Sequence, residues 1–116
     1  MFKQIKKDTS DLVNKIKTTS EYIDYLNYKS ILERNEELYR RVQEFRRRSF
    51  EIQVSHHYGM YNAYENLVNL KNENDELLTE PTVKMFLDSE LKLSRMIQSV
   101  YDTLADEIDF DIEFLN

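Results

Sequence analysis

The sequence has no cysteine at all, and it has only one glycine and one proline among 116 residues. Without cysteine the chain cannot form a disulfide, a thiolate nucleophile, or an iron-sulfur or zinc-thiolate site of its own. With one glycine it cannot build a glycine-rich phosphate loop. Because few residues favour turns while Glu, Lys, Leu and Arg are abundant, the composition predicts an all-α fold made of long helices.

Long hydrophobic runs are also missing. No stretch approaches the roughly 18 apolar residues that suggest a spanning helix, and the first residues, MFKQIKKDTSDL, lack the apolar segment of a secretory signal. We therefore expect a cytoplasmic protein that makes no membrane contact. The net charge of −6 argues against general binding to nucleic acid, although a local basic patch stays open.

The length and the balance of residue types predict one folded domain. Hydrophobic residues make up 41% and charged residues 33% of the chain, which suits amphipathic helices and differs from intrinsic disorder. A chain of 116 residues is too short for two domains that are independently stable without oligomerisation. We expect a single all-helical domain over residues 1–116, with residues 109–116 as an extended C-terminal tail.

A first helix is predicted near the N-terminus, where apolar residues share one stripe at helical spacing: Phe2, Ile5, Leu12 and Ile16. Thr18, followed three places later by Glu21, matches a capping box at the start of a second helix. That helix is expected to run to about Arg34. Asn35 would then cap a third helix.

The third helix has the clearest pattern, with steps of four and three between Leu38, Val42, Phe45, Ser49 and Ile52. It is expected to end near Gly59, which suits a C-terminal cap in the left-handed conformation. The second and third helices are expected to pair as an antiparallel hairpin. Helical spacing continues from Met60 to Leu78, although five asparagines lower the helix propensity there.

The last helix is predicted to begin at Pro81 and to reach about residue 108. Proline suits the first helical position because its φ angle is preset and it has no N–H to leave unpaired. After this helix the sequence DFDIEFLN alternates acidic and apolar residues, which is an extended rather than a helical period. The tail could dock on another protein or fold back over its own subunit or a neighbour, and both readings stay open.

One basic cluster raises the alternative function, a direct RNA-binding protein that uses the stripe Arg40, Arg41, Arg46, Arg47 and Arg48. Three acids, however, precede arginines by four places, in the pairs Glu36–Arg40, Glu37–Arg41 and Glu44–Arg48. Arginines that pair with carboxylates are poorly available to phosphate. We therefore interpret the cluster as a solvated helix face and expect nucleic-acid binding to be absent.

No residues are predicted to be catalytic or to bind a metal or cofactor. His56 and His57 are adjacent, so they point in different directions on a helix, and neither belongs to an HExxH arrangement. The many carboxylates lie on expected helix surfaces, which do not hold two acids in a pocket with separated pKa values. We therefore expect a protein that is not an enzyme.

Aromatic residues exceed what one thin helical hairpin can bury, so some should lie on outer faces and mediate self-association. We expect a homo-oligomer, dimeric or higher, in which the helices form a bundle. The interface candidates are Phe45, Ile52, Phe86, Leu93, Ile97 and Tyr101. The candidates for contact with another partner are Arg47, Phe110 and Phe114.

Three stretches together resemble the YlbF/YmcA family of small helical bacterial proteins: TSEYIDYLNYKSILERNEEL, RVQEFRRRSFEIQ and TEPTVKMFLDSELKLSRMIQSVYDTLADEI. The resemblance depends on the start Ser20-Glu21-Tyr22 with Tyr25, on Phe45 followed by Gln53, and on Pro81-Val83-Phe86 with Glu90. It covers most of the chain and contains no catalytic motif.

The resemblance implies a self-associating helical regulator or adaptor in a bacterial cytoplasm. Family members act with sibling proteins in a complex that influences endoribonuclease Y, and the linked processes are competence, sporulation and biofilm formation. Members best tied to that complex carry cysteine-bearing tails associated with iron-sulfur clusters. This chain ends in DFDIEFLN and has no cysteine, so it is not expected to hold a cluster by itself.

Overall fold

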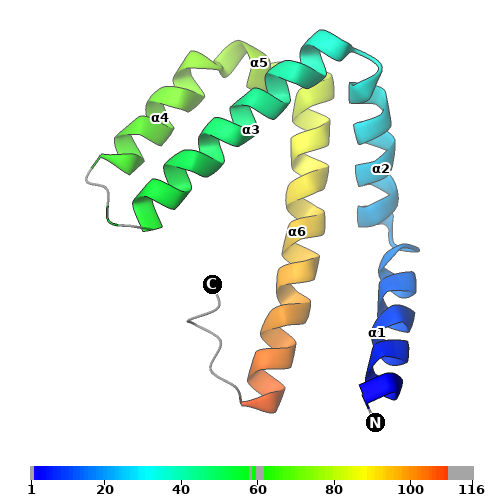
Figure 1. Cartoon of the computed structure of the whole chain (residues 1–116). Helices are drawn as coiled ribbons and strands as arrows, with labels where there is room; N and C mark the ends of the chain where they lie inside the picture. Colours follow the sequence, from blue (N-terminus) through cyan, green and yellow to red (C-terminus); the bar gives the residue numbers. More distant parts are fainter. Residues whose placement is uncertain (1, 58, 60–61, 110–116) are drawn as a thin grey trace. The chain divides into compact units, whose positions relative to one another are not determined.

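The computed structural model describes residues 2–57, 59 and 62–109, and these residues form helices and short turns (Figure 1). The helices are α1 (Phe2–Ile16), α2 (Ser20–Glu33), α3 (Glu36–His57), α4 (Ala63–Glu73), α5 (Asp75–Thr79) and α6 (Pro81–Ile108). No strand occurs in these ranges, which confirms the all-α prediction. The extended tail predicted for residues 109–116 lies outside the described residues, apart from Asp109.

The chain divides into two compact units, which we call the core unit and the terminal unit. The core unit is Asn27–Leu87, and the terminal unit combines Met1–Leu26 with Asp88–Asn116. Every buried hydrophobic residue of the described chain belongs to the core unit: Leu32, Val42, Phe45, Ala63, Leu70, Leu77, Val83 and Phe86. Apolar burial therefore stabilises the core unit, whereas the terminal unit has no such core among its described residues.

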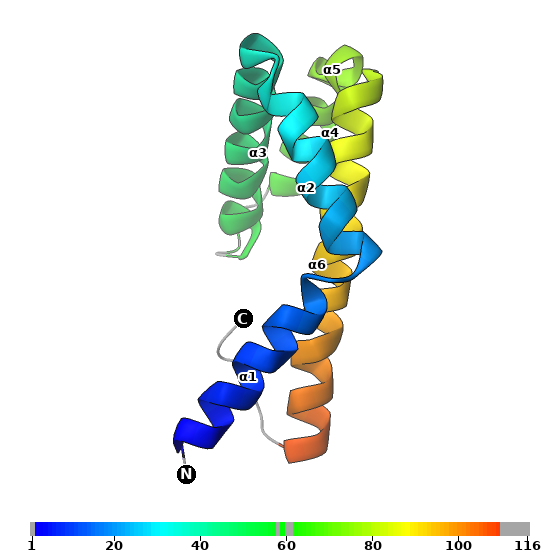
Figure 2. The ribbon, with the colours of Figure 1, turned by 90° about the vertical axis from the view of Figure 1, so that its right-hand side faces the viewer.

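The helical hairpin of the core unit consists of α3 and α4, which run antiparallel side by side (Figures 1 and 2). The sequence predicted a hairpin of the second and third helices, and this pairing is wrong. The reason is that α2 and α4 differ in the number of apolar residues that they bury. Leu32 is the only buried residue of α2, whereas α4 buries Ala63 and Leu70, and the small Ala63 allows close approach of another helix.

Two connections near the N-terminal half are fixed by side-chain caps. The Oγ1 of Thr19 accepts a hydrogen bond from the Tyr22 N–H at 3.3 Å, so Thr19 caps α2. The predicted cap, Thr18, is wrong by one residue, because its hydroxyl instead donates to the Lys15 carbonyl at 2.7 Å in the turn that ends α1. At the start of α3 the predicted cap is confirmed, since the Oδ1 of Asn35 accepts a hydrogen bond at 3.1 Å from the backbone N–H of the third residue of the helix.

The single glycine and the single proline both stand where their backbone properties are used. Gly59 has φ of +78°, the left-handed conformation that the sequence predicted after the third helix. Pro81 is the first residue of α6, also as predicted. The Oε2 of Glu80 accepts a hydrogen bond from the Val83 N–H at 2.9 Å, so an acidic cap precedes the proline.

Asn74 interrupts the segment for which the sequence predicted weak helix propensity. Its side-chain Nδ2 donates to the Leu70 carbonyl at 2.8 Å, and its backbone N–H lies 3.2 Å from the carbonyl oxygens of both Leu70 and Lys71. Asparagine can bond to nearby backbone in this way and so competes with the regular helical pattern. The segment therefore forms two helices, α4 and α5.

Removal of the Phe86 side chain should destabilise the core unit strongly, because Phe86 is only 1% exposed. We expect Phe86→Ala to lower the free energy of unfolding by about 3–5 kcal/mol, the range for large-to-small changes at buried aromatic residues. The measurement is urea denaturation followed by circular dichroism. Leu91→Ala is the control on the same helix, since Leu91 is 48% exposed. Equal losses in the two variants would contradict the assignment of the core.

Candidate functional site

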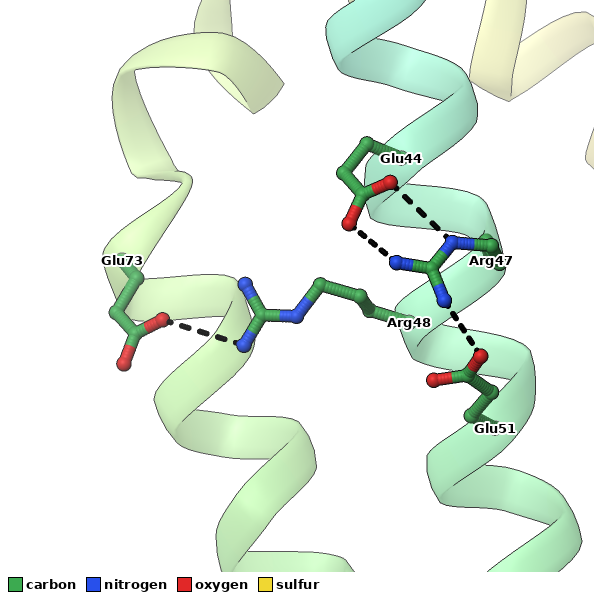
Figure 3. A network of polar contacts seen from close by, with 5 residues as sticks. All are labelled: Glu44, Arg47, Arg48, Glu51 and Glu73. Carbon is green, nitrogen blue, oxygen red and sulfur yellow. Dashed lines mark hydrogen bonds and ion pairs between the residues drawn. The ribbon is translucent and has the colours of Figure 1, made fainter.

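Charged side chains cover the outer face of α3, with Arg47 at the centre of their network. Its Nη2 and Nε approach the carboxylate of Glu44 at 2.5 and 3.2 Å, and its Nη1 lies 2.6 Å from the Oε1 of Glu51 (Figure 3). About two turns earlier in α3, the Nη2 of Arg40 lies 2.6 Å from the Oε1 of Glu37. The planar guanidinium group suits such two-point binding of a carboxylate.

Arg48 belongs to the same helix but reaches across the hairpin. Its Nη2 lies 3.9 Å from the Oε2 of Glu73 on α4 (Figure 3). The sequence predicted that Arg48 pairs with Glu44, and this is wrong because Glu44 binds the guanidinium of Arg47, one turn away. The predicted partners of Arg40 and Arg41 are also wrong, because Glu37 binds Arg40. The expected solvated face with paired charges is nevertheless found, at Arg40 and Arg47.

These ion pairs shift the pKa values of the exposed acids. The hydrogen bond from Arg47, assisted by its charge, lowers the pKa of Glu44 below the ordinary 4.5. The hydrogen bond and the charge of Arg40 lower the pKa of Glu37 in the same way. Exposed pairs contribute little to stability and are screened by salt. Their main consequence is that carboxylates compete with any phosphate for Arg40 and Arg47.

Arg46 shows a different environment from the other arginines of the stripe. Its guanidinium carbon lies 5.7 Å from the ring centroid of Phe86, so the cation covers a buried aromatic ring. Sequence spacing could not reveal this contact, because the two residues are far apart in the chain. The arginines of the stripe therefore have different environments, and Arg46 takes part in the packing of the core unit.

The six interface candidates fall into three environments. Phe45 and Phe86 are buried in the core unit, while Ile52 and Leu93 are half-buried. Ile97 and Tyr101 are 41% and 58% exposed on α6. In a single chain only the last two offer extensive apolar surface to a partner. The interface role of all six residues stays a prediction.

A shallow apolar hollow of about 250 Å³ lies between α3 and α4, and sequence reasoning missed it. Its walls are formed by Ile52, Gln53, Ala63, Tyr64 and Leu67. Two aromatic side chains of this hairpin are exposed: Tyr64, at the hollow, is 78% exposed, and Phe50, on α3, is 65% exposed. The prediction that some aromatic residues lie on outer helix faces is thus confirmed for these two. The hollow contains no pair of acids that could act in catalysis.

Of the residues predicted to contact another partner, only Arg47 can be placed. It lies exposed on α3 within the ion-pair network, whereas Phe110 and Phe114 lie outside the described residues. His56 and His57 form the last turn of α3. In the described part of the chain, no group of three or more His, Asp or Glu side chains is arranged to hold a metal ion. Among the described residues, no helix is long and apolar enough to cross a membrane.

Comparison with known proteins decides the family. Residues 5–109 match a family model described as control of competence regulator ComK, YlbF/YmcA. The chain belongs to the YlbF/YmcA family. The match covers nearly all of the chain, so the resemblance predicted from the sequence is confirmed. Its description places this YlbF/YmcA protein in a family of regulators.

Two relatives of this YlbF/YmcA chain carry the name UPF0342 protein. One, from Desulfitobacterium hafniense strain Y51, is 26% identical over 97 residues, which cover 84% of this chain and 78% of the relative. The other, from Caldicellulosiruptor bescii, is 21% identical over 103 residues, which cover 89% and 87% of the two chains. No solved structure matches this chain significantly.

The ion pair between Glu44 and Arg47 predicts a specific pH response in this YlbF/YmcA protein. Because the folded-state pKa of Glu44 is lowered, the pair stabilises the fold above the ordinary pKa of 4.5 and loses its effect as the pH falls through the lowered value. We expect Arg47→Ala to raise the pKa of Glu44, measured by NMR titration of its side-chain carboxyl carbon. Arg41→Ala is the control and should leave that pKa unchanged. An unchanged pKa in Arg47→Ala would contradict the network.

Proposed function

We propose that this protein is a non-catalytic regulatory adaptor that acts through protein–protein contacts. The proposal rests on one observation, the match of residues 5–109 to the family that controls the competence regulator ComK. By resemblance, the process is RNA processing that depends on endoribonuclease Y, with effects on competence, sporulation and biofilm formation. The partners would be sibling family proteins and endoribonuclease Y, in a bacterial cytoplasm.

Apolar surface on the long helix supports action through protein contacts. Ile97, Tyr101 and Leu104 are each more than two-fifths exposed on α6, at spacings of four and three residues. Such spacing forms a seam that another helix can cover. An adaptor of this kind self-associates or binds siblings through its helices and needs no cofactor of its own.

The arginine stripe gives less support to direct RNA binding. Arg40, Arg47 and Arg48 already face carboxylates, and Arg46 covers the ring of Phe86. The chain as a whole carries a net charge of −6, which repels a phosphate backbone. RNA binding is therefore kept as an outcome of the experiment that tests the adaptor function.

The test is a tagged pull-down from the native bacterium, with and without ribonuclease treatment, read by mass spectrometry. We expect endoribonuclease Y or sibling family proteins in both samples, because the contacts are between proteins. Recovery that disappears after ribonuclease treatment would favour RNA binding. Recovery of the bait alone would contradict the adaptor function.

The residues for partner contact are tested by alanine variants in the same pull-down. We expect Arg47→Ala, Phe110→Ala and Phe114→Ala to reduce recovery of the partner several-fold, since each removes a charged or aromatic side chain proposed to touch it. Arg40→Ala is the matched control for Arg47, because both arginines are exposed on α3 and pair with a glutamate three places earlier. Full recovery with all three variants would remove the contact assignment.

A further inference from the structure

The hairpin of α3 and α4 has two hollows that differ in chemistry. The apolar hollow of about 250 Å³ has no charged residue in its walls. The second hollow, of about 310 Å³, is lined by charged and amide side chains, which include Arg48, Asn69 and Glu73. In the second hollow, Arg48 and Glu73 already pair with each other (Figure 3). The apolar hollow is therefore the better candidate for a contact that another molecule completes.

The apolar hollow has the size and the lining of an anchor site for side chains. Its volume lies below the roughly 300–1,000 Å³ of sites that hold small molecules and cofactors. Ala63 in its wall is only 2% exposed, whereas Tyr64 beside it is 78% exposed. Tyrosine is enriched among the residues that dominate binding at protein interfaces, where anchor side chains fill small pockets. The hollow therefore fits one or two apolar side chains of another protein.

A positive charge lies next to the apolar hollow without a carboxylate to neutralise it. Lys71 follows Leu67 by four residues and Tyr64 by seven, so the three side chains share one side of α4. Lys71 is exposed, and among the described residues no carboxylate forms an ion pair with it. The acids of α4, Glu65 and Glu73, lie about 100° or more round the helix from each of these side chains. This side of α4 therefore combines apolar surface with one uncompensated cation.

We propose that the apolar hollow is the docking site for an amphipathic helix of a partner protein, which places an apolar side chain in the hollow and a carboxylate on Lys71. A helix that lies in a groove is held by anchors about one turn apart. Because Tyr64 and Lys71 are separated by about two turns, or about 10 Å, the partner's acid lies within about two turns of its apolar anchor. An acid is favoured because this side of α4 carries only positive charge.

The inference rests on the proposed adaptor function and deepens it by naming a surface and the kind of partner segment that fits it. It differs from the contact assigned to Arg47, because Arg47 lies in the ion-pair network of α3 and is not part of the hollow. The docking site can therefore be tested separately.

Photo-cross-linking in the native bacterium tests the proposal. Tyr64 is replaced by p-benzoylphenylalanine, an aromatic residue that attaches covalently to neighbouring groups on illumination, and mass spectrometry identifies the attached segment. The matched control carries the same replacement at Phe50, which is also aromatic and 65% exposed but is not part of the hollow. We expect position 64 to attach at least about tenfold more of a partner's helical segment than position 50. That segment should have Asp or Glu within about seven residues of the attachment point.

Exchange of charges then separates a contact at Lys71 from an effect on folding. We expect Lys71→Glu to reduce the attachment at least about tenfold and Lys71→Arg to keep it, because only the first variant repels a carboxylate. Replacement of the partner's acid by lysine should restore attachment to the Lys71→Glu variant, which a folding defect would not allow. Lys84→Glu is the matched control, since Lys84 is exposed on α6 and is not part of the hollow.

Several results would overturn the proposal. Equal attachment at positions 64 and 50, or full attachment with Lys71→Glu, would show that the hollow and its cation do not hold the partner. Attachment to a segment without a nearby acid, to a second copy of this chain or to its own residues 110–116 would assign the hollow to a different occupant. If the pull-down recovers partners while position 64 attaches to none of them, the docking site is wrong and the adaptor function stands. Recovery of the bait alone in the pull-down would instead contradict the adaptor function itself.

Discussion

The apolar core of residues 27–87 is the constraint on which the rest of the structure depends. Phe86 and Val83, from the start of α6, are buried together with residues of α2, α3, α4 and α5. Because α6 begins in this core and runs to Ile108, one helix carries a buried face at its start and an exposed face at its end. The apolar residues at the start of α6 thus stabilise the subunit, and those near its end offer surface to a partner.

This division explains how a protein without a catalytic motif can act as a regulator. The core unit supplies a folded scaffold, and the surfaces that remain are of two chemical kinds. The face of α3 presents arginines already bound to acids, which suits specific contact with another protein better than contact with a phosphate backbone. The terminal unit presents exposed apolar side chains on α1 and α6, which suits association between helices.

Much of the fold could be predicted from the sequence, because the signals were local. The cap at Asn35, the left-handed Gly59 and the proline that opens α6 all depend on residues within one turn of each other. The hairpin partner of α3 could not be predicted, since it depends on which helix offers buried residues such as Ala63 and Leu70 across a distance in sequence. For the same reason spacing alone gave the wrong partner for Arg48 and missed the contact of Arg46 with Phe86.

The central claim is that the core unit is stable in each copy, while the exposed apolar residues of α1 and of the later part of α6 become covered only when copies associate. Amide hydrogen exchange at several protein concentrations tests this most directly, because it reports the stability of each segment separately. The account predicts that protection of residues 2–16 and 97–108 rises with concentration, whereas protection in α3 and at the start of α6 stays constant. Equal protection of residues 2–16 at all concentrations, down to those at which the protein is monomeric, would contradict it.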